Sequence, residues 1–289
     1  MRWLAIANPA AGRARESERL LARLRQLTGF RYEVALTAAP GDATLLARKA
    51  NGFDGIVAVG GDGTIAEVLH GMDLARQRLA VLPAGHGNCL ARDLGVGNAG
   101  RALTSLERKT CQPLDLMEVE IGFADGRQER RLCASTLAVG YVEEVVTLGR
   151  HKLPGLGRAA YAAAAMIAVP SQFEGRLVSN GGARRYTGVV INNTAHLANF
   201  RGLPDASVHD GLLDIMEQDY SWPRQLLHNL AVLVGSRAFG PLSLRQAVAE
   251  QLELGEPRTL MADGELLHDV TRLRVACRPG AVSCVVGTQ

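Results

Sequence analysis

The sequence predicts an N-terminal α/β domain with a doubly wound parallel sheet, followed by a C-terminal antiparallel β-sandwich. Over residues 1–116, strand-like apolar runs alternate with amphipathic helical segments through short links, which is typical of a parallel sheet covered by helices. Over residues 117–289, strand-like runs follow one another through turn residues with few helices between them, as in a sandwich. A chain of 289 residues is long enough for both domains.

The N-terminal domain is expected to contain four strands and five helices. Its strands are expected at residues 3–8, 31–36, 53–60 and 78–85. Its helices are expected at residues 15–27, 42–50, 64–72, 88–94 and 99–109. The first helix illustrates the pattern, because Leu20, Leu24 and Leu27 lie on one face and arginines on the other.

The C-terminal domain is expected to contain mainly strands. They are expected at residues 116–123, 130–140, 186–193, 212–218, 258–265, 270–277 and 282–287. Two helical segments interrupt them, one at roughly 156–169 and one at 222–236. The longest apolar stretch, residues 159–169, is about half of the roughly 20 residues that a membrane span needs.

Composition and charge exclude few classes of protein. The chain is 47% hydrophobic and 21% charged, as in an ordinary globular protein, and its net charge is +3. This charge is too small to indicate nucleic-acid binding, and no nucleic acid is expected as a partner; it is compatible with an anionic ligand or membrane surface. The five cysteines are widely spaced and form no CxxC pair, so neither a zinc site nor a disulfide framework is indicated. A cytoplasmic location is expected.

Three of the N-terminal strands are expected to end in turns rich in glycine or proline, at residues 8–12, 60–64 and 83–88. In a parallel sheet these turns fall along one edge, where ligands bind. Glycine lets a ligand approach the backbone, and the helix start behind such a turn suits a phosphate group. The chain lacks the P-loop pattern, and it lacks G-x-G-x-x-G after its first strand.

The order of these turns resembles the catalytic domain of the diacylglycerol kinase and sphingoid-base kinase family. The matching motifs are "NPAAG" (8–12), Thr37, "GGDGTIAEVLHG" (60–71), "PAGHGNCLARDLG" (83–95), "DGLLDI" (210–215) and "ADGE" (262–265). The resemblance spans most of the chain. It implies ATP-dependent phosphorylation of a lipid hydroxyl, an NAD kinase-like N-terminal fold, and an active site in the cleft between the two domains.

The resemblance also implies ATP and Mg²⁺ as cofactors. The residues it assigns to the nucleotide are Asn8, Pro9, Gly12, Thr37, Gly60, Gly61, Gly63, Thr64, Glu67, Gly85, His86 and Asn88. The sequence departs from the family at His86, where Thr or Ser is usual, and at Cys89, where Asp is frequent. An imidazole can still donate a hydrogen bond to a phosphate. The alternative for these residues is that they only shape turns and helix starts.

Three carboxylates are the catalytic candidates that the resemblance implies: Asp62, Asp263 and Glu265. Asp263 and Glu265 lie two residues apart on an expected strand and hence on the same face. Phosphoryl transfer needs a carboxylate near the attacking hydroxyl, and we expect Glu265 to accept the proton. Asp62 is the second candidate for that role, or it holds magnesium through water. The alternatives are an N-cap at Asp62 and a plain β-turn over residues 262–265.

A structural magnesium site is implied at the segment "SVHDGLLDI". Ser207 and Leu212 would provide backbone carbonyls and Asp210 a carboxylate, an oxygen set that suits a hard cation. The alternative is an Asp-Gly turn before a strand.

The expected partner is a lipid substrate at a membrane surface. Arg150, Lys152 and Arg158 precede the apolar helix near 156–169, which could give peripheral membrane contact; the alternative is that this helix packs in the core. A homodimer stays open. Two other functions also stay open: an NAD kinase-like enzyme, which shares the GGDGT turn, and a catalytically weak module that binds nucleotide or lipid.

Overall fold

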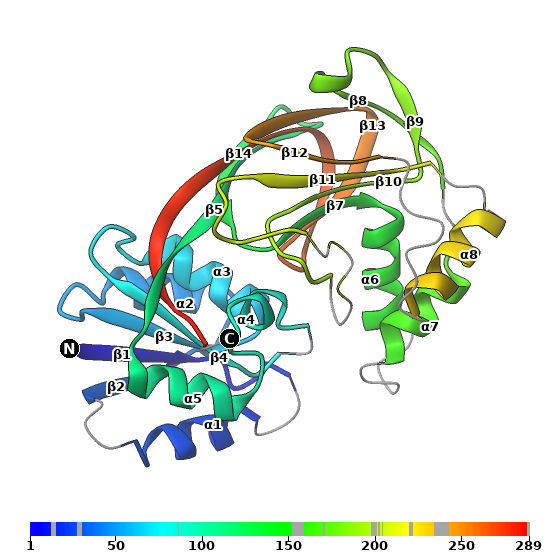
Figure 1. Cartoon of the computed structure of the whole chain (residues 1–289). Helices are drawn as coiled ribbons and strands as arrows, with labels where there is room; N and C mark the ends of the chain where they lie inside the picture. Colours follow the sequence, from blue (N-terminus) through cyan, green and yellow to red (C-terminus); the bar gives the residue numbers. More distant parts are fainter. Residues whose placement is uncertain are drawn as a thin grey trace.

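The computed structural model contains an N-terminal α/β region and a C-terminal strand-rich region (Figure 1). This arrangement confirms the predicted fold class. The structure describes residues 1–12, 16–27, 31–85, 87–151, 159–169, 171–197, 201, 203, 205–219, 222–233 and 243–287.

The N-terminal region is built on a parallel sheet in the order β2-β1-β3-β4. Its strands are β1 (Arg2–Ala7), β2 (Arg31–Leu36), β3 (Gly55–Gly60) and β4 (Arg78–Pro83). Its helices are α1 (Glu16–Leu24), α2 (Asp42–Arg48), α3 (Asp62–Gly71), α4 (Cys89–Asp93) and α5 (Ala99–Arg108). Strand β3 is buried along its whole length, as its uninterrupted apolar run predicts.

The C-terminal region consists of antiparallel strands around a second hydrophobic core. Its strands are β5 (Cys111–Phe123), β6 (Gln128–Cys133), β7 (Thr136–Gly140), β8 (Phe173–Leu177), β9 (Arg184–Tyr186), β10 (Gly188–Asn192), β11 (Leu213–Gln218), β12 (Ser243–Ala247), β13 (Ala249–Ala262) and β14 (Glu265–Val285). Its helices are α6 (Tyr141–His151), α7 (Ala159–Ile167) and α8 (Trp222–Leu233), with the short 3₁₀ helix η2 (Val178–Asn180). Figure 1 shows α6, α7 and α8 grouped beside these strands.

Two long strands join the regions. The division expected at residue 116 falls inside β5, and β5 pairs with β14 over most of its length. The end of β14 returns to the first sheet, where Ser283 pairs with Arg78 and Cys284 with Leu79 of β4 in parallel. The two sheets are therefore continuous through β14.

The structure differs from the sequence prediction mainly in the C-terminal region, where β8, β9, β12 and residues 249–257 of β13 were not predicted as strands. Helix α6 was not predicted; it packs Val146 into a cluster with β7 and β10 residues, so tertiary contacts override its β-branched valines. The strand predicted at 130–140 is divided into β6 and β7 at residues 134–135, and 270–287 belongs largely to one strand. Residues 234–236 of the last predicted helix lie outside the described residues. Among the helices that are described, none is long and apolar enough to cross a membrane.

Candidate active site

The three glycine-containing turns of the N-terminal region meet backbone to backbone. Gly12 has a φ of +70°, and a Cβ atom there would lie 1.7 Å from the carbonyl oxygen of Ala84. A Cβ atom on Gly85 would lie 2.5 Å from the Cα atom of Gly61. Only glycine fits these contacts, so the sequence places main-chain groups, rather than side chains, at this edge of the sheet.

Two asparagines stabilise the turns. Asn8 donates from Nδ2 to the hydroxyl of Thr64 at 3.3 Å, and its Oδ1 accepts from the Ala10 amide at 2.9 Å. Asn88, in the left-handed region at φ 50°, accepts from the Gly85 amide at 3.0 Å and donates to the Gly85 carbonyl at 2.8 Å. In the described structure both side chains therefore shape the turns around the expected phosphate site.

The other residues expected at the nucleotide lie at different distances from these turns. Thr37 follows β2, and its amide binds the carbonyl of Ala7 at 2.9 Å, so it lies beside the end of β1. Glu67 accepts a hydrogen bond from the Ala43 amide at 3.1 Å and thereby caps the start of α2. Pro9 is exposed and Gly60 ends β3, whereas His86 lies outside the described residues.

Gly63 differs from the other turn glycines because it faces open space. It is exposed, and no atom would lie within 4 Å of a Cβ atom built on it. It is the second residue of α3, where backbone amides have no partner within the helix. A phosphate group can reach the helix start from this side.

Asp62 is the first residue of α3. Its Oδ1 accepts from the Leu90 amide at 3.4 Å, at the start of α4. Burial, and next the negative charge of Asp263, raise the pKa of Asp62 to about 6, while the backbone amides of α4 oppose this rise. The charge of Asp263, in the β13–β14 turn, therefore acts on Asp62 in the N-terminal region.

Asp263 lies in the turn between β13 and β14, with φ 47°. Its carboxylate accepts from the Ala134 amide at 2.7 Å, from the Ser135 amide and hydroxyl at 2.8 and 2.9 Å, and from the Thr136 amide at 3.0 Å. The expectation that Asp263 and Glu265 share one strand face is wrong, because the chain turns between them. These bonds also explain the break between β6 and β7.

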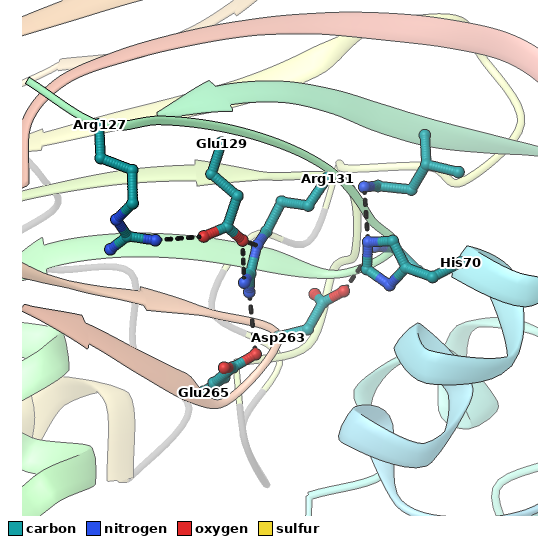
Figure 2. Close-up of polar contacts among 8 residues, drawn as sticks. His70, Arg127, Glu129, Arg131, Asp263 and Glu265 are labelled. Carbon is teal, nitrogen blue, oxygen red and sulfur yellow. Dashed lines mark hydrogen bonds and ion pairs between the residues drawn. The ribbon is translucent and has the colours of Figure 1, made fainter. Parts of the chain in front are cut away.

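Glu265 begins β14, and its side chain is 63% exposed. Its Oε2 accepts from Nη1 of Arg131 at 2.9 Å. Arg131 lies on β6 with only 13% of its side chain exposed, and its Nε donates to Glu129 at 2.9 Å. Figure 2 shows the guanidinium group of Arg131 between the two carboxylates.

His70 connects the two regions. This last-turn residue of α3 accepts a hydrogen bond at Nε2 from the Leu132 amide of β6, at 2.9 Å (Figure 2). Burial lowers the pKa of His70, which favours the neutral ring that this bond requires. Neither His70 nor Arg131 was among the site residues predicted from the sequence. The only signal for Arg131 was the i, i+2 spacing of Arg127, Glu129 and Arg131, of which the last two lie on one face of β6; these three residues form a charged row.

The segment expected to hold magnesium forms a tight turn before β11. Leu212 donates its amide to Asp210 Oδ1 at 3.0 Å, and the hydroxyl of Ser207 accepts from the His209 amide at 3.2 Å. Burial raises the pKa of the nearby Asp214 to about 6, against the hydrogen bond from Gln246, and Asp210 and Asp205 add to the rise.

The oxygen donors and the excess negative charge of this turn fit a hard cation. Among the described residues, no group of three or more Asp, Glu, His or Cys side chains could hold a metal ion. A cation here would therefore need backbone carbonyls, such as those of Ser207 and Leu212, in addition to the Asp210 carboxylate.

The site as a whole can bind a phosphate-bearing ligand through main-chain amides and present an exposed carboxylate to a hydroxyl group. Its parts come from both regions, since α3 carries Asp62 and His70 while the β13–β14 turn carries Asp263 and Glu265. Such a pairing of phosphate-binding turns with carboxylates is typical of phosphoryl transfer.

Comparison with known proteins points to one family. Residues 2–119 match the family model described as the diacylglycerol kinase catalytic domain. The chain is 30% identical over 281 residues to a Pseudomonas aeruginosa protein named "Probable lipid kinase YegS-like", covering 92% of this chain and 88% of that one. It is 29% identical over 228 residues to the diacylglycerol kinase of Bacillus subtilis, covering 73% and 71% of the two chains.

A solved structure supports the fold. The crystal structure of a diacylglycerol kinase from Bacillus anthracis superposes with a TM-score of 0.75 at 21% identity, covering 99% of this chain and 97% of that one. At this identity the likeness shows that the two chains share a fold, including the placement of both regions.

Proposed function

This chain belongs to the diacylglycerol kinase and sphingoid-base kinase family and is an ATP-dependent lipid kinase; we propose that it transfers the γ-phosphoryl group where the glycine turns face the β13–β14 turn. One observation carries this assignment of the site. Helix α3, which starts at the phosphate-binding turns, is joined to β6 by the bond from the Leu132 amide to His70, and the residue after β6, Ala134, donates its amide to Asp263 of the β13–β14 turn. The nucleotide end and the acceptor end of a kinase site would thus meet here.

Main-chain amides of the turns around Gly12, Gly61 and Gly85 would hold the phosphates of ATP. The close backbone contacts between these turns support this role, because they hold the amides in fixed positions before the ligand arrives. The start of α3 adds the positive end of its dipole. Binding by fixed dipoles stabilises the charge that develops on the transferred group.

Glu265 would accept the proton of the lipid hydroxyl. Its exposure leaves the carboxylate accessible to a substrate, whereas Asp263 is committed to four hydrogen bonds and is 6% exposed. We therefore assign Asp263 a positioning role and Glu265 the role of base. Since phosphoryl transfer passes through a loose transition state, the placement of the hydroxyl matters more than strong basicity.

Mg²⁺ would neutralise charge on the phosphates when it is bound with ATP. Burial, and next the negative charge of Asp263, raise the pKa of Asp62; a cation facing this carboxylate, directly or through water, would stabilise its charged form. We propose a second, structural Mg²⁺ at the turn of Ser207, Asp210 and Leu212, where the donor set is suitable.

The substrate would be reached at a membrane surface. Ile167, the last residue of α7, is 58% exposed, and Val169, just after the helix, is 65% exposed. Leu227 and Leu230 of α8 are 46% and 44% exposed. These apolar side chains support peripheral contact with lipid. Lys152 and Arg158, expected to assist, lie outside the described residues. A homodimer is not required, because one chain supplies both the turns and Glu265.

A lipid panel tests the proposed function. Purified protein, radiolabelled ATP and Mg²⁺ are incubated with vesicles containing diacylglycerol, a sphingoid base, ceramide or phosphatidylglycerol, and in a separate reaction with NAD. We expect a phosphorylated lipid and no NADP. Labelled NADP without any labelled lipid, or no product from any lipid extract, would exclude a lipid kinase.

Two substitutions test the assigned residues. Glu265→Ala and Asp62→Ala are each expected to lower turnover by at least ~100-fold, a typical size for a positioned acid–base group. ATP binding should survive in Glu265→Ala, because the phosphates are held by the turns. Normal turnover in both variants would refute the site.

A further inference from the structure

We propose that Arg131 is a positioning residue that holds the Glu265 carboxylate in the orientation that accepts the substrate proton. This inference rests on the proposed function, because it assumes that Glu265 is the base. Its basis is the 2.9 Å bond from Nη1 of Arg131 to Oε2 of Glu265, between residues 134 positions apart in the chain.

Arg131 is itself held firmly. Its Nε donates to Glu129 at 2.9 Å, its Nη2 binds the same carboxylate, and Arg127 contacts the other oxygen of Glu129 at 3.2 Å. Arg131 and Glu129 lie opposite Val119 and Ile121 of β5, which belong to the C-terminal core. The side chain of Arg131 therefore extends from a packed sheet and has little conformational freedom, and only 13% of it is exposed.

Glu265, in contrast, needs an external partner to have a defined position. Its side chain is 63% exposed, and a glutamate loses considerable rotamer freedom when it is fixed. Exposed ion pairs are usually weak, but here one partner is already immobilised, so only the glutamate has to be ordered. A carboxylate held in place before the hydroxyl arrives contributes to rate through orientation.

The strand that carries Arg131 is also attached to the phosphate-binding part of the site. The next residue, Leu132, donates its amide to His70 on α3, and α3 begins at Asp62. Figure 2 shows this sequence of contacts from α3 through β6 to Glu265. Arg131 thus fixes the base relative to the helix whose start faces the phosphates.

Five variants of the 289-residue chain test this inference: Arg131→Gln, Arg131→Lys, Glu265→Gln, the double variant Arg131→Gln/Glu265→Gln, and Arg130→Gln as the matched control. Arg130 is the neighbouring arginine, 85% exposed and paired with Glu120. We expect Arg131→Gln to lower kcat by ~10–50-fold with the KM for ATP changed less than ~2-fold, the range available from positioning. Arg130→Gln should stay within ~2-fold of the wild type.

The double variant separates positioning from a direct role. If Arg131 acts through Glu265, adding Arg131→Gln to Glu265→Gln should lower kcat by less than ~2-fold further. The inference is overturned if Arg131→Gln lowers kcat as much in the Glu265→Gln background as in the wild type, or if it raises the KM for ATP. Either result would mean that Arg131 contacts phosphate or acts only through the stability of the protein. Arg131→Lys, which retains the charge, should recover part of the kcat.

Failure of the inference is distinguishable from failure of the proposed site. Full activity of Arg131→Gln together with a defective Glu265→Gln overturns the inference and leaves the base assignment intact. Full activity of Glu265→Gln overturns both. Thermal unfolding and ATP binding of each variant identify a folding defect, and Arg131→Lys then provides the comparison in a folded protein.

Discussion

The glycine turns and the charged row of β6 build two halves of one site by different means. The turns use main-chain groups, and a side chain at Gly12 or Gly85 would collide with a neighbouring backbone. The row uses side chains: its Arg131 binds Glu265 of β14, which lies 134 positions away in the sequence. A site built from backbone tolerates no added atom, whereas a site built from side chains can be weakened one contact at a time.

The largest effect on stability is expected for Gly12→Ala. The new Cβ atom would overlap the carbonyl oxygen of Ala84, and the φ of +70° would be strained, each costing about 1–3 kcal/mol. We expect the free energy of unfolding to fall by about 3 kcal/mol or more, with loss of ATP binding, as measured by urea denaturation and titration calorimetry. Gly63→Ala is the control and should change the free energy of unfolding by less than about 1 kcal/mol. Equal losses of stability in the two variants would contradict the close backbone contact between Gly12 and Ala84.

Asp263→Asn is expected to have the next largest effect. The amide would keep one acceptor oxygen and turn an NH₂ group toward buried donors of residues 134–136, so a loss of about 2–3 kcal/mol is expected. Glu265→Gln, two residues away and exposed, should cost less than about 1 kcal/mol. Chemical denaturation of both variants checks this contrast. A stable Asp263→Asn would show that the turn does not depend on the carboxylate.

Asp62→Asn is expected to stabilise the protein while it abolishes turnover. The folded pKa of about 6 lies above the ordinary value of 3.8, so the folded state binds the proton more tightly and loses stability as the pH rises from about 4 to 6. Asparagine carries no such charge. With a chelator present, the free energy of unfolding of Asp62→Asn should exceed that of the wild type by roughly 1–3 kcal/mol at pH 7.5. Below pH 4 the two proteins should differ by almost nothing. A variant less stable than the wild type at pH 7.5 would contradict this.

The smallest effect is expected for His70→Ala. Loss of the bond to the Leu132 amide should cost about 1 kcal/mol at pH 7.5. Because burial lowers the pKa of His70 from 6.5, the unfolded chain is protonated first as the pH falls below 6.5, and the stabilisation by the neutral ring is lost. The difference between wild type and variant should therefore shrink at pH 5.5. A difference that grows on acidification would exclude a neutral His70.

The sequence predicted the fold class, the family and the kinase function correctly. The continuous apolar run at 53–60 indicated β3, and the apolar residues at helical spacing in 64–72 indicated α3. Both patterns are readable because a buried strand and a helix with one buried face place their apolar residues at different spacings. Helix α6 was not predicted, because Val146 gains its partners only from distant strands. The roles assigned to the site residues remain predictions. Glu67, predicted at the nucleotide, accepts a hydrogen bond from the Ala43 amide at the start of α2.

What the sequence determined by itself is local: which segments become strands and helices, and which turns are rich in glycine. These properties depend on backbone conformation and on neighbours a few residues away, so they leave a readable pattern. That Gly12 and Gly85 admit no side chain was decided by the tertiary structure, because Ala84 and Gly61 lie far from them in the chain. The tertiary structure alone also decided the set of partners of each charge, such as Asp263 with residues 134–136 and Glu265 with Arg131. Charge pairing acts between side chains that chain folding brings together, and no spacing along the sequence encodes it.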